Sequence, residues 1–232
     1  MKKLYLVVIT SIILAGCKVG VEATVNSDDL LREVHQESWA AVDVEVAACG
    51  DFEDSRKPSR SLKKAYEVVL SIFENAMYLK CYQKNFNSYA RFSIPMSVGH
   101  MSLEGDLQTQ GPADIHIVSN DYIYLGVAIA PESLKRIKRM KLAQRRNYQN
   151  FDLSFSITLN KGEKPIPELF VVGSYISNEY FSDKPIAISK VNIASDTLTI
   201  KLSDVTNTII SEGGIGPILF TKEAIADIVN LP

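Results

Sequence analysis

The chain has 232 residues, of which 46% are hydrophobic and 22% charged, and its formal net charge is −2. This composition is typical of a globular protein with a sizeable core, and it excludes a disordered tail. The nearly balanced charge gives no support to general nucleic-acid binding, so we expect no nucleic-acid partner.

The first 17 residues have the pattern of an export signal. Met1-Lys2-Lys3 is a positive start, and an apolar run over residues 4–15 follows, interrupted only by Thr10 and Ser11. Crossing a bilayer takes roughly 20 apolar residues, so this run is too short. A positive start, a short apolar run and small residues are typical of a secretory signal.

Leu14-Ala15-Gly16-Cys17 resembles the lipobox of bacterial lipoproteins. The resemblance implies cleavage of a signal peptide, residues 1–16, and acylation of Cys17, whose acyl chains would anchor the chain to a membrane. Lys18 follows, which in enteric-type bacteria resembles the outer-membrane sorting class. The implied location is the cell envelope, with an outer-membrane-anchored domain facing the periplasm. An ordinary signal peptide or an N-terminal membrane helix remains an alternative.

Cys49 and Cys81 are the other two cysteines. An even pair in an exported chain predicts a disulfide, which should stabilise the fold by roughly 3 to 4 kcal/mol. Two cysteines without a nearby histidine lack the usual metal-ligand set. The histidines, His35, His100 and His116, are far apart in the sequence and lie in no ligand motif. We therefore expect no metal and no cofactor.

The first predicted elements alternate in type. Residues 18–26 alternate apolar and polar side chains, which predicts a strand, and Ser27 is expected to cap a short helix that includes Val34. Residues 39–48 form a second predicted strand, with Asp43 and Glu45 on its solvent face. Residues 28–54 contain nine acids and one base, Arg32.

The clearest amphipathic helix follows a polar loop over residues 50–60. Ser61 is its expected cap, and apolar residues at spacings of three and four carry it from residue 62 to the neighbourhood of Cys81. The disulfide would then join this helix to the preceding strand. Residues 86–98 predict a strand with Pro95 near an edge or bulge. Residues 115–118 and 122–130 predict a hairpin.

Pro131 opens a second long helix that is expected to end near Asn150. Its outer face is strongly basic, and it could bind an envelope protein or an anionic envelope component. A solvated face, or pairing with the acidic segment 28–54, is the alternative. The candidate partner-binding residues are Lys135, Arg136, Lys138, Arg139, Lys141, Arg145 and Arg146.

The remaining chain is predicted to be mostly β. The expected strands are 151–159, 169–176, 186–193, 197–202 and 206–210, the third and fourth forming a hairpin. Thr221 is expected to cap a final helix through Val229. The fold class is therefore α+β, with mixed or antiparallel sheets and two long amphipathic helices. Residues 17–232 would form one domain, with a subdivision near 105–111 as the alternative.

These features favour a non-enzymatic binding or interaction module in the cell envelope. An exclusion or immunity lipoprotein of a mobile element is one alternative. The other is a hydrolase acting on an envelope polymer, with Asp43 and Glu45 as acid and base. A flat, open sheet face around these two carboxylates would remove the support for the hydrolase.

Overall fold

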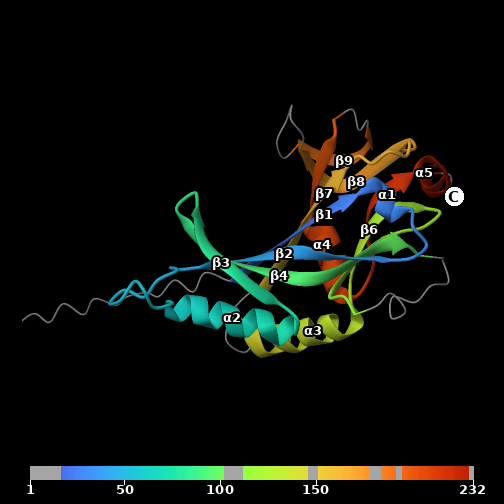
Figure 1. The fold of residues 1–232 in the computed structure, drawn as a ribbon. Coiled ribbons are helices and arrows are strands. Elements are labelled where there is room, and N and C mark those ends of the chain that lie inside the picture. Colours follow the sequence, from blue (N-terminus) through green and yellow to red (C-terminus); the bar gives the residue numbers. More distant parts are fainter. Residues whose placement is uncertain (1–16, 102–111, 146–150, 178–183, 192–194, 230–232) are drawn as a thin grey trace, which may run out of the picture.

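The computed structural model describes residues 17–101, 112–145, 151–177, 184–191 and 195–229 (Figure 1). They form one mixed 11-stranded sheet with five helices, which confirms the predicted α+β class. The leader, residues 1–16, and the alternative boundary at 105–111 lie outside the described residues. None of the described helices has the length and apolar character that a membrane span requires.

The strands and helices follow one another along the whole described chain. The strands are β1 (Cys17–Asn26), β2 (Gln36–Val46), β3 (Met77–Lys84), β4 (Asn87–His100), β5 (Ile115–Ser119), β6 (Ile123–Ile129), β7 (Phe151–Asn160), β8 (Leu169–Ser177), β9 (Lys184–Val191), β10 (Thr197–Leu202) and β11 (Gly216–Thr221). The helices are α1 (Ser27–Leu30), α2 (Arg60–Ile72), α3 (Pro131–Arg145), α4 (Asp204–Glu212) and α5 (Lys222–Val229).

The sheet runs in the order β10-β7-β1-β2-β4-β5-β6-β11-β8-β9, with β3 paired to β4 outside this path. β10 also pairs with β8, so the strand path closes on itself. The pairs β1–β7 and β4–β5 are parallel, and the other strand pairs of the described sheet are antiparallel. Because successive side chains alternate between faces, Val21, Val42 and Phe92 lie in register on one buried face.

The helices cover this buried face. α2 places Leu62, Val69 and Ile72 in the core against β2 and β4, and α3 lies beside α2 (Figure 1). α4 packs on β7, β6 and β11. We call the opposite side of β1, β2 and β4, which carries Asp43 and Arg91, the outer face. The core therefore lies between the curled sheet and the helices, and the outer face is free to carry polar groups.

Two boundaries in the N-terminal half differ from expectation. α2 ends at Ile72, and Cys81 lies on strand β3 instead of a continuing helix. Antiparallel pairing with β4 outweighs the helical spacing of the apolar residues beyond Ile72. The predicted disulfide between Cys49 and Cys81 is confirmed, with a Cα separation of 5.7 Å, but it joins the loop after β2 to β3.

Two helix caps also differ from the predicted residues by one or two positions. The side chain of Ser59, not Ser61, caps α2 by accepting a hydrogen bond from the Leu62 amide. Asn26 caps α1 in place of Ser27, and α1 is a single turn that leaves Val34 outside it and exposed. In both cases a polar residue slightly earlier in the chain has the extended backbone that a cap needs.

The C-terminal half contains two further corrections. Residues 206–210 form part of helix α4, not a strand. Their β-branched side chains suggested a strand, but the Ser203 cap and Gly213, with φ of 105°, define a helix at both ends. β9 and β10 do not form a hairpin, because β9 pairs with β8 while β10 pairs with β7 and β8. The Thr221 cap of α5 is confirmed by the bond from Ala224.

Candidate functional site

A gap in strand pairing defines the main cavity. β2 occupies one edge of β4, while β3 and β5 share the other edge. β3 pairing reaches Ser93, and β5 pairing starts at Met96, so Pro95 lies between them. Proline has no N–H to leave unpaired at such a gap, and its carbonyl accepts a hydrogen bond from the Asp114 amide at 3.0 Å. The predicted interruption at this proline is therefore a change of partner strand.

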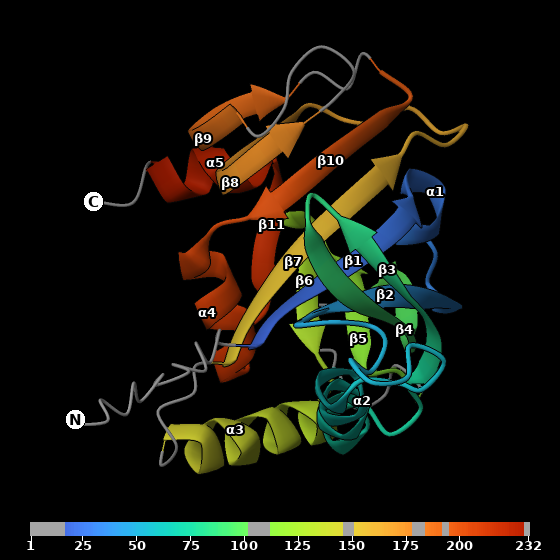
Figure 2. The ribbon, with the colours of Figure 1, turned by 90° about the vertical axis from the view of Figure 1, so that its left-hand side faces the viewer.

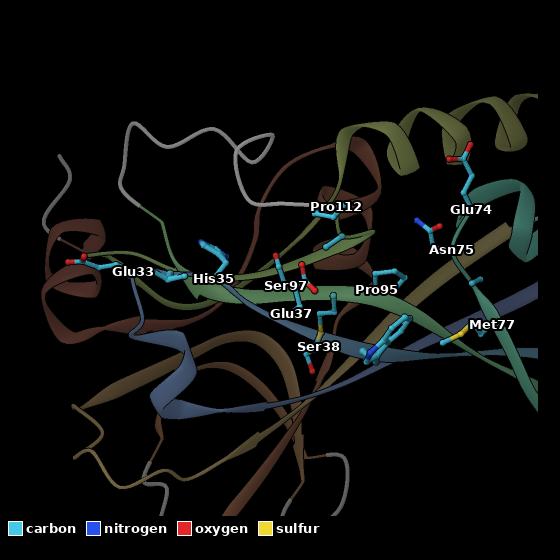
Figure 3. A pocket seen from close by; sticks show the side chains of 15 residues that line it. Glu33, His35, Glu37, Ser38, Glu74, Asn75, Met77, Pro95, Ser97 and Pro112 are labelled. Atoms are coloured by element: carbon cyan, nitrogen blue, oxygen red, sulfur yellow. The ribbon is translucent and has the colours of Figure 1, made fainter.

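A pocket of about 860 Å³ opens at this gap (Figure 3). Pro95 and Ser97 come from β4, Glu37 from β2, and Met77 from the start of β3. The complete described lining is Glu33, Val34, His35, Glu37, Ser38, Trp39, Glu74, Asn75, Ala76, Met77, Pro95, Met96, Ser97, Pro112 and Ala113. Three carboxylates and no lysine or arginine occur among these residues. Arg136 pairs with one of them, Glu74, so the acidic character of the described lining comes from Glu33 and Glu37.

The pocket also exposes apolar surface. Trp39 is the only tryptophan of the chain, and 54% of its surface is accessible to solvent. Met77 and Val34 line the same pocket and are also exposed. Clustered exposed apolar side chains with a polar rim are typical of a surface that binds a partner or a ligand. The sequence alone does not single out Trp39, because alternation along a strand assigns a side chain to one face but does not show whether that face is buried.

The three histidines meet beside this pocket, although they are far apart in the sequence. His35 donates through Nε2 to the His100 carbonyl at 3.1 Å, while its Nδ1 is buried without a partner. His100 Nδ1 lies 3.2 Å from Ser119 Oγ, and His116 Nδ1 lies 2.7 Å from Ser97 Oγ. The parallel pairing of β4 with β5 brings these side chains together, and only the sheet register reveals it.

Burial keeps two of these histidines neutral at neutral pH. It lowers the pKa of His35 and lowers the pKa of His116 to about 4, with a smaller contribution from the neighbouring His35. Within the described ranges, no group of three or more His, Cys, Asp or Glu side chains is placed to hold a metal ion. His35 itself lines the pocket, and His116 lies in hydrogen-bond contact with Ser97, another lining residue.

The second polar site surrounds Asp43 on the outer face. Arg91 donates to Asp43 Oδ1 from Nε at 2.8 Å and also contacts Oδ2, while Tyr82 donates to Oδ2 at 2.9 Å. Arg91 Nη2 reaches Glu22 Oε2 at 2.7 Å as well. We call these four side chains the Asp43 cluster. Burial, followed by the bond to Asp43, raises the pKa of Tyr82 to about 12.

Asp43 was expected on a solvent face, but it is only 8% exposed. β3 pairs with β4 and brings Tyr82 over the carboxylate, a tertiary contact that the strand's alternation does not reveal. Asp43 and Glu45 line a pocket of about 410 Å³, so the surface around them is not flat. The bidentate contact with Arg91 engages both carboxylate oxygens, which favours a structural role for Asp43.

The basic face of α3 is largely used within the molecule. Arg136 donates to the carbonyl of Ile72, the last residue of α2, and pairs with Glu74 at 2.8 Å. Lys138 donates to the carbonyl of Glu212, the last residue of α4. Cations at these carbonyls satisfy the free acceptors of two helix C-termini.

The remaining candidates on α3 differ in their surroundings. Lys141 contacts Ser211 at 3.1 Å, Lys135 pairs with Glu132 at 3.6 Å, and Arg139 is exposed. The Arg145 side chain and Arg146 lie outside the described residues. The partners of the described α3 cations, which are Ile72, Glu74, Glu132, Ser211 and Glu212, all lie outside the acidic segment 28–54. Among the described candidates, Lys135, Lys138 and Arg139 are exposed on α3, and their role in binding a partner stays a prediction.

Comparison with known proteins places the chain in a family. No curated protein and no solved structure matches it. Residues 19–225, which include both polar sites, match a protein family described as "Domain of unknown function (DUF7424)". That match covers most of the chain, and the protein therefore belongs to the DUF7424 family.

Proposed function

We propose that this protein is a lipid-anchored binding module of the cell envelope, attached to the outer membrane and facing the periplasm. The observation that carries the binding role is the pocket at Pro95, where Trp39 and Met77 are exposed beside acidic side chains. An exposed apolar surface with a charged rim suits recognition. The ion-paired state of Asp43 argues against it as the acid of a hydrolase.

The anchor is supported by the sequence Leu14-Ala15-Gly16-Cys17. Replacing Cys17 with serine should move the protein from the membrane fraction to the soluble fraction, because the acyl chains supply the attachment. The Cys49→Ser, Cys81→Ser double variant is the matched control and should stay with the membrane. Unchanged membrane association of the Cys17→Ser variant would refute the lipid anchor.

The chemistry of the pocket indicates its ligand. Glu33 and Glu37 lie on the rim, the described lining contains no cation, and burial keeps His35 neutral at neutral pH. We infer that the pocket takes a protein segment in which apolar and basic side chains alternate or adjoin. The apolar side chains would pack on Trp39, and the basic ones would lie near the carboxylates.

Trp39 provides a direct test, since it is the only tryptophan. A short peptide of alternating leucine and lysine should shift its fluorescence to shorter wavelength and saturate, whereas a leucine–glutamate peptide should not. Glu37→Lys should weaken the binding several-fold. Glu163→Lys, which changes an exposed acid after β7, should leave it unchanged. Equal responses to both peptides, or equal weakening by both variants, would refute an acidic apolar binding pocket.

A further inference from the structure

The end of the sheet at which Cys17 lies carries two fully exposed phenylalanines. We propose that this end rests on the lipid bilayer and that Phe52 and Phe86 insert their rings into its interface. The inference rests on the proposed lipid anchor and goes beyond it, because an anchor alone does not fix which side of the domain faces the membrane.

The register of the sheet sets the position of the anchor. Cys17 is the first residue of β1 and already pairs with Phe151 of β7. Val19 of β1 lies opposite Val44 of β2, and the same antiparallel register places Cys17 level with Val46. A chain acylated at Cys17 would have no linker between the lipid and the sheet. This edge of the domain would then lie within a few residues' length of the bilayer surface.

The turn between β3 and β4 extends beyond the position of Cys17 along the strand direction. Ser88 of β4 pairs with Val46, and the turn at Asn85 and Phe86 lies further along the same direction. Two residues of strand span about 7 Å, so the Phe86 ring can reach past the start of β1. The hairpin projects from the body at the left of Figure 1, and this end faces the viewer in Figure 2.

Phe86 has no structural role that explains it. Asn85 and Phe86 have φ of 51° and 68°, as in a two-residue turn of type I′, where glycine is strongly preferred at the second position. A bulky side chain in this conformation is strained, and the Phe86 side chain is 104% exposed, so no contact within the protein compensates. Strained residues of this kind cluster at functional positions.

Phe52 presents a second ring from the neighbouring loop. The loop leaves β2 at the same end and is tied to β3 by the disulfide between Cys49 and Cys81. Gly50 forms a β-bridge with Pro58, and the backbone amide of Asp51 donates a hydrogen bond to the Lys57 carbonyl at 2.8 Å. These contacts fix the base of the loop. Phe52 lies beyond this base and is 103% exposed.

The composition of the two tips indicates how they would contact lipid. Acids and bases are both present in the Phe52 loop and beside the Phe86 turn: Asp51, Glu53, Asp54, Arg56, Lys57 and Lys84. Three acids and three bases balance in formal charge, and Arg56 and Lys57 both pair with Asp54. Phenylalanine is among the apolar side chains that membrane-surface segments bury at the boundary between the headgroups and the acyl chains. The contact should therefore depend on the rings and only weakly on anionic lipid.

Fluorescence quenching by lipid tests the proposed orientation. The full acylated protein is reconstituted into phosphatidylethanolamine–phosphatidylglycerol vesicles, with or without bromine on the acyl chains, in a Trp39→Phe background. Phe52→Trp and Phe86→Trp place a single fluorophore at either tip. Tyr122→Trp is the control, since its turn follows β5 at the His100 end of β4, the opposite end of the sheet.

Brominated vesicles should reduce the emission of tryptophan at positions 52 and 86 and leave position 122 unchanged, with similar results when phosphatidylglycerol is omitted. Equal emission in both kinds of vesicle at 52 and 86, with the protein still bound, would overturn the orientation and leave the anchor standing. Quenching at 122 as strong as at 86 would also overturn it. Failure of the anchor itself would be recognised separately, by an unmodified Cys17 in the mass spectrum.

Discussion

Two regions of the outer face of β2 start from similar sequence and reach different states. Around Asp43 the outer face is covered by two side chains, Arg91 of β4 and Tyr82 of β3, which close in the carboxylate. Trp39 lies opposite Pro95 of β4, at the point where the pairing of β4 with β3 has ended and its pairing with β5 has not begun. Here the outer face stays open and forms the pocket. We refer to these as the covered region and the open region.

The difference shows that strand alternation assigns a residue to a face but does not say whether that face is buried. Asp43 and Glu37 both lie on the outer face of β2, six pairs apart along the strand. Asp43 lies opposite Arg91 of β4 and forms a structural ion pair, whereas Glu37 lies opposite Ser97 and is left available to a ligand. A carboxylate that keeps its charge free in an accessible pocket is the better candidate for binding.

Removing the disulfide should have the largest effect and should act on the covered region. The Cys49→Ser, Cys81→Ser variant should lose about 3 to 4 kcal/mol of unfolding free energy, because the bond closes a loop between residues 32 positions apart. Urea unfolding followed by circular dichroism measures it. Trp39 emission in the folded state should stay unchanged, and a large shift there would contradict the separation of the two regions.

Lowering the pH should act on the wall of the open region through His116. Its pKa is about 4 in the folded protein against an ordinary value of 6.5. The unfolded chain therefore binds the proton more readily, and the stability present above pH 6.5 is lost as the pH falls towards 4. We expect His116 to account for about 2 to 3 kcal/mol of loss between pH 7 and pH 4.

The His116→Asn variant, whose amide can still bond Ser97, should lose less stability over the same pH range. Urea unfolding at both pH values measures the difference. An identical pH dependence in the two proteins would show that His116 does not titrate as a buried group.

Breaking the ion pair should destabilise the covered region by a moderate amount. Arg91→Ala leaves Asp43 nearly buried without its cation, and we expect a loss of about 2 to 3 kcal/mol in unfolding free energy. Arg56→Ala removes an exposed ion pair with Asp54 and should change stability by less than about 0.5 kcal/mol. Equal effects of the two variants would mean that burial by β3 does not strengthen the pair.

Replacing Phe86 should give the smallest change and the opposite sign. Phe86→Gly relieves a positive φ at no loss of contact, so we expect a gain of about 0.5 to 1 kcal/mol in unfolding free energy. Phe52→Gly is the matched control, because Phe52 is equally exposed but has no positive φ and should not gain stability. A destabilised Phe86→Gly variant would point to a structural role for the ring.

Local patterns allowed several features to be predicted. The α+β class, most strands, the start of α3 at Pro131 and the pairing of Cys49 with Cys81 all follow from periodicity, turn residues or an even cysteine pair. The end of α2 and the nature of residues 206–210 were predicted wrongly. In both places the pattern of apolar or β-branched residues fits either structure, and sheet pairing or caps decide between them.

The sequence by itself determined which residues alternate along most strands and where Pro95 interrupts one and Pro131 starts a helix, since each of these depends on neighbours in the chain. Only the tertiary structure decided that three distant histidines adjoin, that Tyr82 of β3 reaches Asp43, and that Trp39 faces an open pocket. Those outcomes depend on which strands pair and in what register. Pairing of this kind joins residues tens of positions apart, so no local pattern specifies it.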